Sequence, residues 1–165
     1  MRTTIGVHIF QMVSILFIAR NVPCHPYDHS KTCNVTVDRG QVLQLYGLNG
    51  AGKTTVLKSL AGYVISQDLI ISQHSTCLIR SDSQLLHGLT VKEQLAYYEQ
   101  LSGRRSHLAS DWLKDIITKD TSALSLGQAR RLYLAQLYFS KADVWLLDEP
   151  LIGLDALAQE RFMHI

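Results

Sequence analysis

The chain has 165 residues, of which 47% are hydrophobic and 18% charged, and its formal net charge is +2. This length and apolar content suit one domain of ordinary size with a buried core, and so small a net charge argues against a nucleic-acid partner. The three cysteines, Cys24, Cys33 and Cys77, are odd in number and lack C-x-x-C spacing. They therefore predict a reducing compartment and no disulfide framework.

The N-terminal stretch has two interpretations. Residues 5–19 are largely apolar, but this run is shorter than the roughly 20 residues that a membrane-spanning helix needs. In the favoured interpretation, residues 14–20 form the first strand of a domain covering 14–165, and residues 1–13 are an extension of unknown role. In the other, the N-terminus is a targeting segment, because the first 27 residues carry two arginines and no acid.

Residues 47–54 read G-L-N-G-A-G-K-T, a complete phosphate-binding loop of the pattern G-x-x-x-x-G-K-[ST]. A strand is expected over residues 41–46 before it and a helix over 54–61 after it, which is the order the motif requires. Glycines let the backbone N–H groups curl around phosphates, a lysine adds positive charge, and a threonine hydroxyl can ligate Mg²⁺. The expected ATP-binding residues are Gly47, Leu48, Asn49, Gly50, Ala51, Gly52, Lys53, Thr54 and Thr55.

A helical subdomain is expected over about residues 90–125. Residues 91–101 have the apolar spacing of an amphipathic helix, and the tyrosines within it are expected to pack rather than to recognise a ligand. Ser125 then has the sequence position of a helix N-cap, with Gln128 at the capping-box spacing. Because a helix N-terminus attracts anions, this turn is a second candidate anion site.

Residues 144–149 form an apolar run that ends in two acids, as expected for a buried parallel strand. Ligands of open α/β sheets bind at the carboxyl ends of strands, so Asp148 is expected to hold Mg²⁺ together with Thr54. Glu149 is the expected general base that polarises the attacking water, and Lys53 is the second residue expected to act in catalysis.

These segments together resemble the ABC-type ATPases. The similarity rests on residues 47–54, 124–128, 145–150 and 153–155, which look like the Walker A, signature, Walker B and D-loop elements in their usual order. The resemblance implies an α/β fold, a P-loop NTPase core with a small helical subdomain, that binds ATP and Mg²⁺.

The same resemblance implies roles for residues outside the phosphate loop. Ser125, Gly127 and Gln128 would form the signature that faces the nucleotide of a second copy, and Asp155 would touch that copy. Tyr27 lies where such proteins present an aromatic ring to adenine, but it is equally well read as a surface tyrosine. Asp82 stands where the family places a metal-reaching glutamine, and it is a tentative metal ligand.

Within the superfamily, residues 128–137 and 145–150 are similar to CcmA, the ATP-binding subunits of the cytochrome c maturation (haem exporter) system. This implies a homodimer that hydrolyses ATP and drives a membrane-spanning, CcmB-like subunit. It also implies a membrane-associated location, on the matrix face of the mitochondrial inner membrane or the cytoplasmic face of a bacterial inner membrane.

The family's switch histidine and closing strands have no counterpart before residue 165, so the resemblance is C-terminally incomplete. Two alternatives to the transport ATPase are therefore open. One is an ATP-binding module without efficient hydrolysis, and the other is the ATPase subunit of a different ABC transporter.

Overall fold

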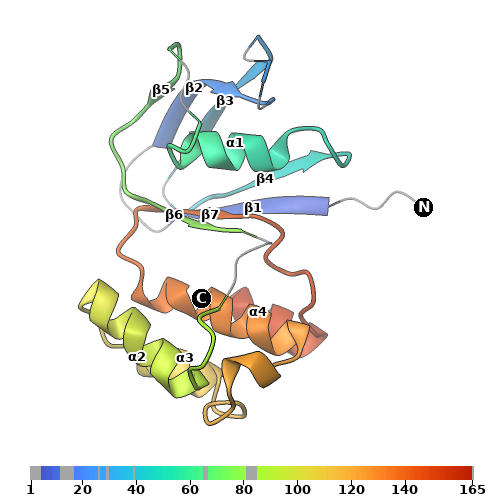
Figure 1. Ribbon diagram of the computed structural model, residues 1–165. Coiled ribbons are helices and arrows are strands. Elements are labelled where there is room, and N and C mark those ends of the chain that lie inside the picture. Colours follow the sequence, from blue (N-terminus) through green and yellow to red (C-terminus); the bar gives the residue numbers. More distant parts are fainter. Residues whose placement is uncertain are drawn as a thin grey trace. The chain divides into compact units, whose positions relative to one another are not determined.

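The computed structural model describes residues 5–11, 17–25, 27–28, 30–38, 40–64, 67–80 and 85–164. The chain divides into two compact units, which are taken separately below (Figure 1). Unit 1 consists of residues 1–81 and 142–150, and unit 2 consists of residues 82–141 and 151–165. In the described part of the chain, no helix combines the length and the apolarity needed to cross a bilayer.

Unit 1 contains a four-stranded sheet in the order β4-β1-β7-β6. Strand β1 (Ile5–Gln11) runs antiparallel to both β4 (Val42–Gly47) and β7 (Val144–Leu147). Strand β6 (Thr76–Ile79) runs parallel to β7. All four residues of β7 are buried, so the predicted buried strand before Asp148 is confirmed, parallel to one of its neighbours and antiparallel to the other.

A second sheet of unit 1 has three strands in the order β3-β2-β5. These are β3 (Thr32–Val37), β2 (Phe17–Pro23) and β5 (Ile70–Ile71). Helix α1 (Lys53–Leu60) lies between the two sheets (Figure 1). Its Leu57 side chain is fully buried in a core that also holds Phe17 and Leu146, one from each sheet. This packing fixes the start of α1, where the predicted phosphate loop ends.

Residues 1–13 were predicted to be an extension outside the domain, but β1 falls within that stretch. The favoured interpretation placed the first strand at residues 14–20. A strand, however, needs apolar residues only at alternate positions, and Ile5, Val7 and Ile9 provide them in the sequence. The strand expected over 14–20 is found as β2, beginning at Phe17 among the described residues.

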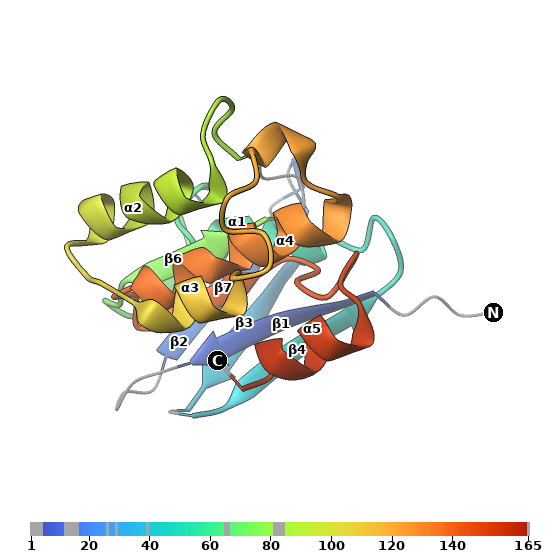
Figure 2. The ribbon, with the colours of Figure 1, turned by 90° about the horizontal axis from the view of Figure 1, so that it is seen from below.

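Unit 2 is helical (Figure 2). Its elements are α2 (Val91–Ser102), α3 (His107–Trp112), the 3₁₀ turn η1 (Thr121–Ala123), α4 (Leu126–Ala135), the 3₁₀ turn η2 (Gln136–Phe139) and α5 (Ala156–Phe162). Helices α2, α3 and α4 all contact η2. Aromatic rings anchor it, since Tyr98 lies 6.1 Å from Phe139 and Trp112 lies 6.0 Å from Tyr138, measured between ring centroids.

This unit is larger than the predicted subdomain of about residues 90–125, because it also includes α4, η2 and α5. The 3₁₀ turn η2 continues directly from α4, and α2 and α3 contact η2, so both α4 and η2 belong with the helices that precede them. The predicted helix over 91–101 is confirmed as α2. Of its tyrosines, Tyr98 packs as expected and burial raises its pKa, whereas Tyr97 is 40% exposed.

Candidate nucleotide-binding site

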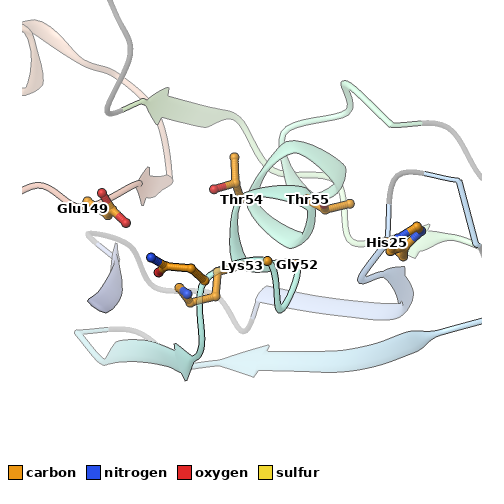
Figure 3. A pocket seen from close by; sticks show the side chains of 8 residues that line it. His25, Gly52, Lys53, Thr54, Thr55 and Glu149 are labelled. Atoms are coloured by element: carbon orange, nitrogen blue, oxygen red, sulfur yellow. The ribbon is translucent and has the colours of Figure 1, made fainter. Parts of the chain in front are cut away.

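A cavity of 590 Å³ opens at the start of α1, within unit 1 (Figure 3). It is lined by His25, Asn49, Gly50, Gly52, Lys53, Thr54, Thr55 and Glu149. In Figure 3, Glu149 and His25 lie on opposite sides of the first turn of α1. Six of the eight lining residues come from the predicted phosphate loop and the residue after it, so the structure gathers them around one hollow.

The N-terminus of α1 is left open by its own sequence. The N-cap residue is Gly52, with φ 92°, and no side chain caps the helix. A Cβ atom at Gly52 would lie 1.7 Å from the Cys24 carbonyl oxygen, so only glycine fits there. None of the first-turn residues is acidic. The first N–H groups of a helix point outward and carry its positive dipole end, so this turn is suited to an anion.

Lys53 is folded back over the loop that precedes it. Its Nζ donates hydrogen bonds to the carbonyl oxygens of Gly47, at 2.8 Å, and Leu48, at 3.0 Å. These bonds hold the ammonium group beside the cavity that Lys53 lines. A phosphate in the cavity would therefore meet a positive charge that is already positioned.

Thr54 and Asp148, the two predicted Mg²⁺ ligands, are in direct contact. The Thr54 hydroxyl donates to Asp148 Oδ2 at 3.0 Å, although the residues are 94 positions apart in the sequence. Asp148 is buried, and its backbone N–H donates to the Ile79 carbonyl at 2.8 Å, which extends the parallel ladder of β6 and β7. The sheet therefore fixes where this carboxylate emerges.

The oxygen atoms of this pair fit magnesium. Mg²⁺ is commonly held by one or two protein oxygens together with the phosphates of its substrate, rather than by a cage of side chains. Among the described residues, no group of three or more His, Cys, Asp or Glu side chains could hold a metal ion on its own. One carboxylate and one hydroxyl beside an uncapped helix N-terminus therefore suit a Mg²⁺ ion whose remaining ligands include phosphate oxygens.

Glu149 lines the cavity in an unusual backbone conformation. Its φ is 52°, in the left-handed region that non-glycine residues seldom adopt. Such a conformation costs about 1–2 kcal/mol, so it persists only where the surroundings impose it. Here Glu149 comes two residues after the end of β7, and its carboxylate is turned towards the cavity (Figure 3).

Other predicted residues lie differently. Leu48, Ala51 and Gly47 belong to the loop, but they are not among the residues that line the cavity. Tyr27 is 92% exposed and is likewise not a lining residue. Asp82 lies outside the described residues.

His25 is the lining residue that the sequence did not indicate. Its Nδ1 accepts hydrogen bonds from the backbone N–H groups of Tyr27, at 3.3 Å, and Asp28, at 3.0 Å. A neutral imidazole that accepts at Nδ1 carries its proton on Nε2, which makes Nε2–H the donor of the ring. The only hint in the sequence was that His25 lies two positions before Tyr27, the residue expected to contact the nucleotide. No motif indicates which of the two residues lines the cavity.

The signature and D-loop candidates meet within unit 2. Ser125 caps α4 and forms a complete capping box with Gln128, as predicted. A Cβ atom at Gly127 would lie 2.5 Å from the Gly153 carbonyl oxygen, so the start of α4 packs closely on the turn before α5. Asp155 caps α5, and its Oδ1 accepts from the Ala158 N–H at 2.8 Å.

Comparison with known proteins agrees with this geometry. The sequence pattern of the ABC transporter family matches residues 30–152, which is most of the chain. The chain belongs to the ABC transporter family. The P-loop ABC ATPase fold expected from the sequence is thereby confirmed.

Curated relatives within the family carry the name "Cytochrome c biogenesis ATP-binding export protein CcmA". The protein from Paracoccus denitrificans is 37% identical over 124 residues, covering 72% of this chain and 59% of the relative. That from Nitrobacter winogradskyi is 34% identical, covering 80% of this chain and 74% of the relative. The resemblance to CcmA is thus confirmed, although this ABC-family chain spans only about three fifths of the Paracoccus protein.

Solved ABC-type structures share the fold. An ATP-binding subunit of an ABC transporter matches with a TM-score of 0.67 and 18% identity, covering 91% of this chain and 72% of that one. The RNase-L inhibitor matches with a TM-score of 0.64 and 23% identity, covering 93% and 31%. At these identities the likeness concerns the fold alone.

Proposed function

We propose that the chain binds ATP with Mg²⁺ at the cavity of unit 1 and hydrolyses it, as the ATP-binding subunit of a transporter-type complex for cytochrome c maturation. The observation that carries this proposal is the hydrogen bond between Thr54 and Asp148 at an uncapped helix N-terminus. It joins a hydroxyl, a carboxylate and open N–H groups at one point, which is what a metal-bound triphosphate requires.

Each residue then has a task. The N–H groups of the loop and the first turn of α1 bind phosphate oxygens, and Lys53 contributes its charge. Thr54 and Asp148 would hold the Mg²⁺, which would neutralise charge on the phosphates. Glu149 accepts a proton from the water that attacks the terminal phosphate. Most of the rate enhancement is positional and electrostatic, since phosphoryl transfer asks for little covalent chemistry from the protein.

His25 adds a contact that the family resemblance did not assign to it. With Nδ1 occupied by two backbone N–H groups, the Nε2–H can donate to an oxygen of the nucleotide on the side of the cavity away from Glu149. Tyr27 is exposed and does not line the cavity, so we assign this hydrogen bond to His25 and no adenine contact to Tyr27.

The assembly is proposed from the relatives. Two copies would combine their phosphate loops with each other's signature residues Ser125, Gly127 and Gln128, with Asp155 at the contact, and would act on a CcmB-like membrane subunit. Leu126 supports an interface at this turn, because its side chain is 76% exposed beside Gly127. Membrane association would follow from that partner, on a bacterial or a mitochondrial inner membrane.

The test of catalysis compares phosphate release by the parent protein with that of Glu149→Gln. We expect Glu149→Gln to lose about 100-fold or more in turnover, while MgATP affinity stays within about twofold. Glu160→Gln, an exposed acid on α5, is the matched control and should behave as the parent. Parent turnover no faster than that of Glu149→Gln would show a binding module rather than an ATPase.

The test of the biological role is complementation. A bacterial strain that lacks its own CcmA would receive this chain or its Lys53→Ala variant, and c-type cytochromes would be read by haem staining. We expect restoration by the parent chain only. For the dimer, ATP-dependent association should be lost in Leu126→Arg, and persistence of the dimer would contradict the proposed interface.

A further inference from the structure

Two cysteines of unit 1 lie together on the hairpin of β2 and β3. The strands pair Val22 with Cys33 and Pro23 with Thr32, and the Cys24 N–H continues the ladder by donating to the Lys31 carbonyl at 2.8 Å. Cys24 is therefore paired with Lys31, and Cys33 is its diagonal neighbour on the same face of the hairpin. Both thiols are half-buried and free.

The two thiols also interact with each other. Cys24 Sγ donates to the Val22 carbonyl at 3.5 Å, and the Cys33 thiol is hydrogen-bonded to Cys24. Burial, together with this hydrogen bond, raises the pKa of the Cys33 thiol to about 12. Cys33 therefore stays protonated at neutral pH, and a reaction of the pair begins at Cys24.

Cys24 is also in contact with the phosphate loop. Its carbonyl oxygen occupies the space where a Cβ atom of Gly52 would lie, at 1.7 Å. Gly52 is the N-cap of α1, and the residue after Cys24, His25, lines the same cavity as Gly52 and Lys53. A displacement of the Cys24 backbone therefore reaches the proposed nucleotide site from two directions.

We propose that Cys24 and Cys33 are a redox-sensitive pair whose oxidation to a disulfide weakens nucleotide binding at the adjoining phosphate loop. Diagonal neighbours in a regular ladder have Cα atoms about 7–8 Å apart, whereas disulfides span about 4.4–6.8 Å. Closing the bond therefore draws the Cys24 backbone towards Cys33 and shifts its carbonyl relative to Gly52. The effect on binding rests on the proposed function, but the formation of the disulfide does not.

The oxidant would be a small-molecule disulfide such as oxidised glutathione. Cys24 gives its proton to water, and the thiolate attacks one sulfur of the oxidant, whose S–S bond breaks to release one thiolate that takes up a proton. Cys33 then attacks the Cys24 sulfur of this mixed disulfide and gives its proton to the departing second thiolate. Two protein thiols are oxidised to one disulfide, and the small disulfide is reduced to two thiols.

The first test is chemical and needs no nucleotide. The purified chain is treated with oxidised glutathione, digested without reduction and mapped by mass spectrometry. We expect a Cys24–Cys33 cross-linked peptide in the parent and in Cys77→Ala, which removes the third cysteine on β6. Stable glutathione adducts on both residues, or the absence of a cross-link, would overturn the proposal.

The second test measures the coupling. Oxidation should weaken MgATP binding about fivefold or more, and dithiothreitol should restore it. Cys24→Ala, which keeps only the protonated Cys33 of the pair, should bind equally well with and without oxidant. Amide hydrogen exchange at residues 50–54 should rise on oxidation in the absence of nucleotide. A cross-link that alters neither affinity nor exchange would overturn the coupling, whereas a reduced protein that fails to bind MgATP would contradict the proposed function instead.

Discussion

The N-termini of α1 and α4 both carry sequence signals of an anion site, but they are built in opposite ways. At α1 the cap is a glycine without a side chain, and the cavity lies in front of it. At α4 the Ser125 hydroxyl accepts from the Gln128 N–H, at 3.3 Å, and Gln128 Oε1 accepts from the Ser125 N–H, at 3.2 Å. One helix start is open to a ligand and the other is stabilised by its own side chains.

The comparison shows that a helix N-terminus is not by itself a binding site. What distinguishes α1 is the absence of a competing side chain, together with the charge of Lys53 and the hydroxyl–carboxylate pair nearby. At α4 the capping box already satisfies the N–H groups of Ser125 and Gln128. Any contact with a second nucleotide would therefore use the other N–H groups of the first turn. The predictions below test this contrast, in order of decreasing effect.

The largest effect is expected at Gly52. Gly52→Ala should lower the free energy of unfolding by about 3 kcal/mol, because it adds left-handed strain to a collision with the Cys24 carbonyl. Gly62→Ala is the matched control: it has a similar φ of 79°, but nothing lies within 4 Å of its Cβ position. It should cost only about 1 kcal/mol in urea denaturation. Equal costs at both positions would refute the close approach of Cys24 to the loop.

The next effect concerns ligand affinity at the open terminus. Lys53→Ala should weaken MgATP binding by about 2 kcal/mol, or roughly 30-fold, in calorimetric titration, because the phosphates lose a charged donor. Lys58→Ala changes the same residue type on the same helix, away from the cavity, and should bind within about twofold of the parent. Similar losses in both variants would point to a general effect of charge rather than to a site.

The capped terminus should show the reverse pattern. Ser125→Ala should lower the free energy of unfolding by about 1 kcal/mol, because the first turn of α4 loses its hydroxyl acceptor. Its MgATP affinity as a monomer should stay that of the parent. Ser125→Thr keeps the hydroxyl and should be close to neutral. A loss of monomer affinity in Ser125→Ala would mean that α4 belongs to the same nucleotide site.

The smallest effect on stability is expected at an ion pair between α4 and the rest of unit 2. The two terminal guanidinium nitrogens of Arg131 donate to the two carboxylate oxygens of Asp115, at 3.1 and 2.6 Å, and these bonds hold the pKa of Asp115 below its usual range. Because the folded pKa is lower, the stabilisation is present above the unfolded pKa and is lost as the pH falls through the folded value.

Asp115→Asn should therefore lower the free energy of unfolding by less than about 1 kcal/mol at neutral pH, because the carboxylate is largely exposed. Below the pKa of Asp115 the substitution should have no effect, because the carboxyl group is then protonated in the parent too. Asp111→Asn, whose exposed carboxylate lies 3.8 Å from Lys114, is the control and should be near neutral throughout. A cost at Asp115 that does not change with pH would exclude the ion pair as its cause.

Local patterns in the sequence predicted the local structure well. The capping box of Ser125 and Gln128 was predicted from spacing alone, because both partners lie within one helical turn. The phosphate loop and α1 followed from a motif whose glycines and lysine act on neighbouring residues. The apolar run before Asp148 predicted β7 because a buried strand leaves a continuous hydrophobic segment.

Contacts between distant segments were not predictable in the same way. Nothing in the sequence around Cys24 shows that its carbonyl lies against Gly52, since that contact depends on how β2 packs beside α1. For the same reason His25, rather than Tyr27, lines the cavity. The extent of unit 2 was underestimated because α4 was assigned by its motif, whereas the contacts of α2 and α3 with η2, which continues directly from α4, decide its place.

The most direct test of the central claim is a titration of the ¹⁵N-labelled protein with MgATP, followed by amide NMR. The account predicts that the largest shift changes fall on residues 50–54, at the open start of α1, and that the amides of residues 125–128 change little while the protein is monomeric. Changes centred on residues 125–128, or none at residues 50–54 at saturating MgATP, would contradict it.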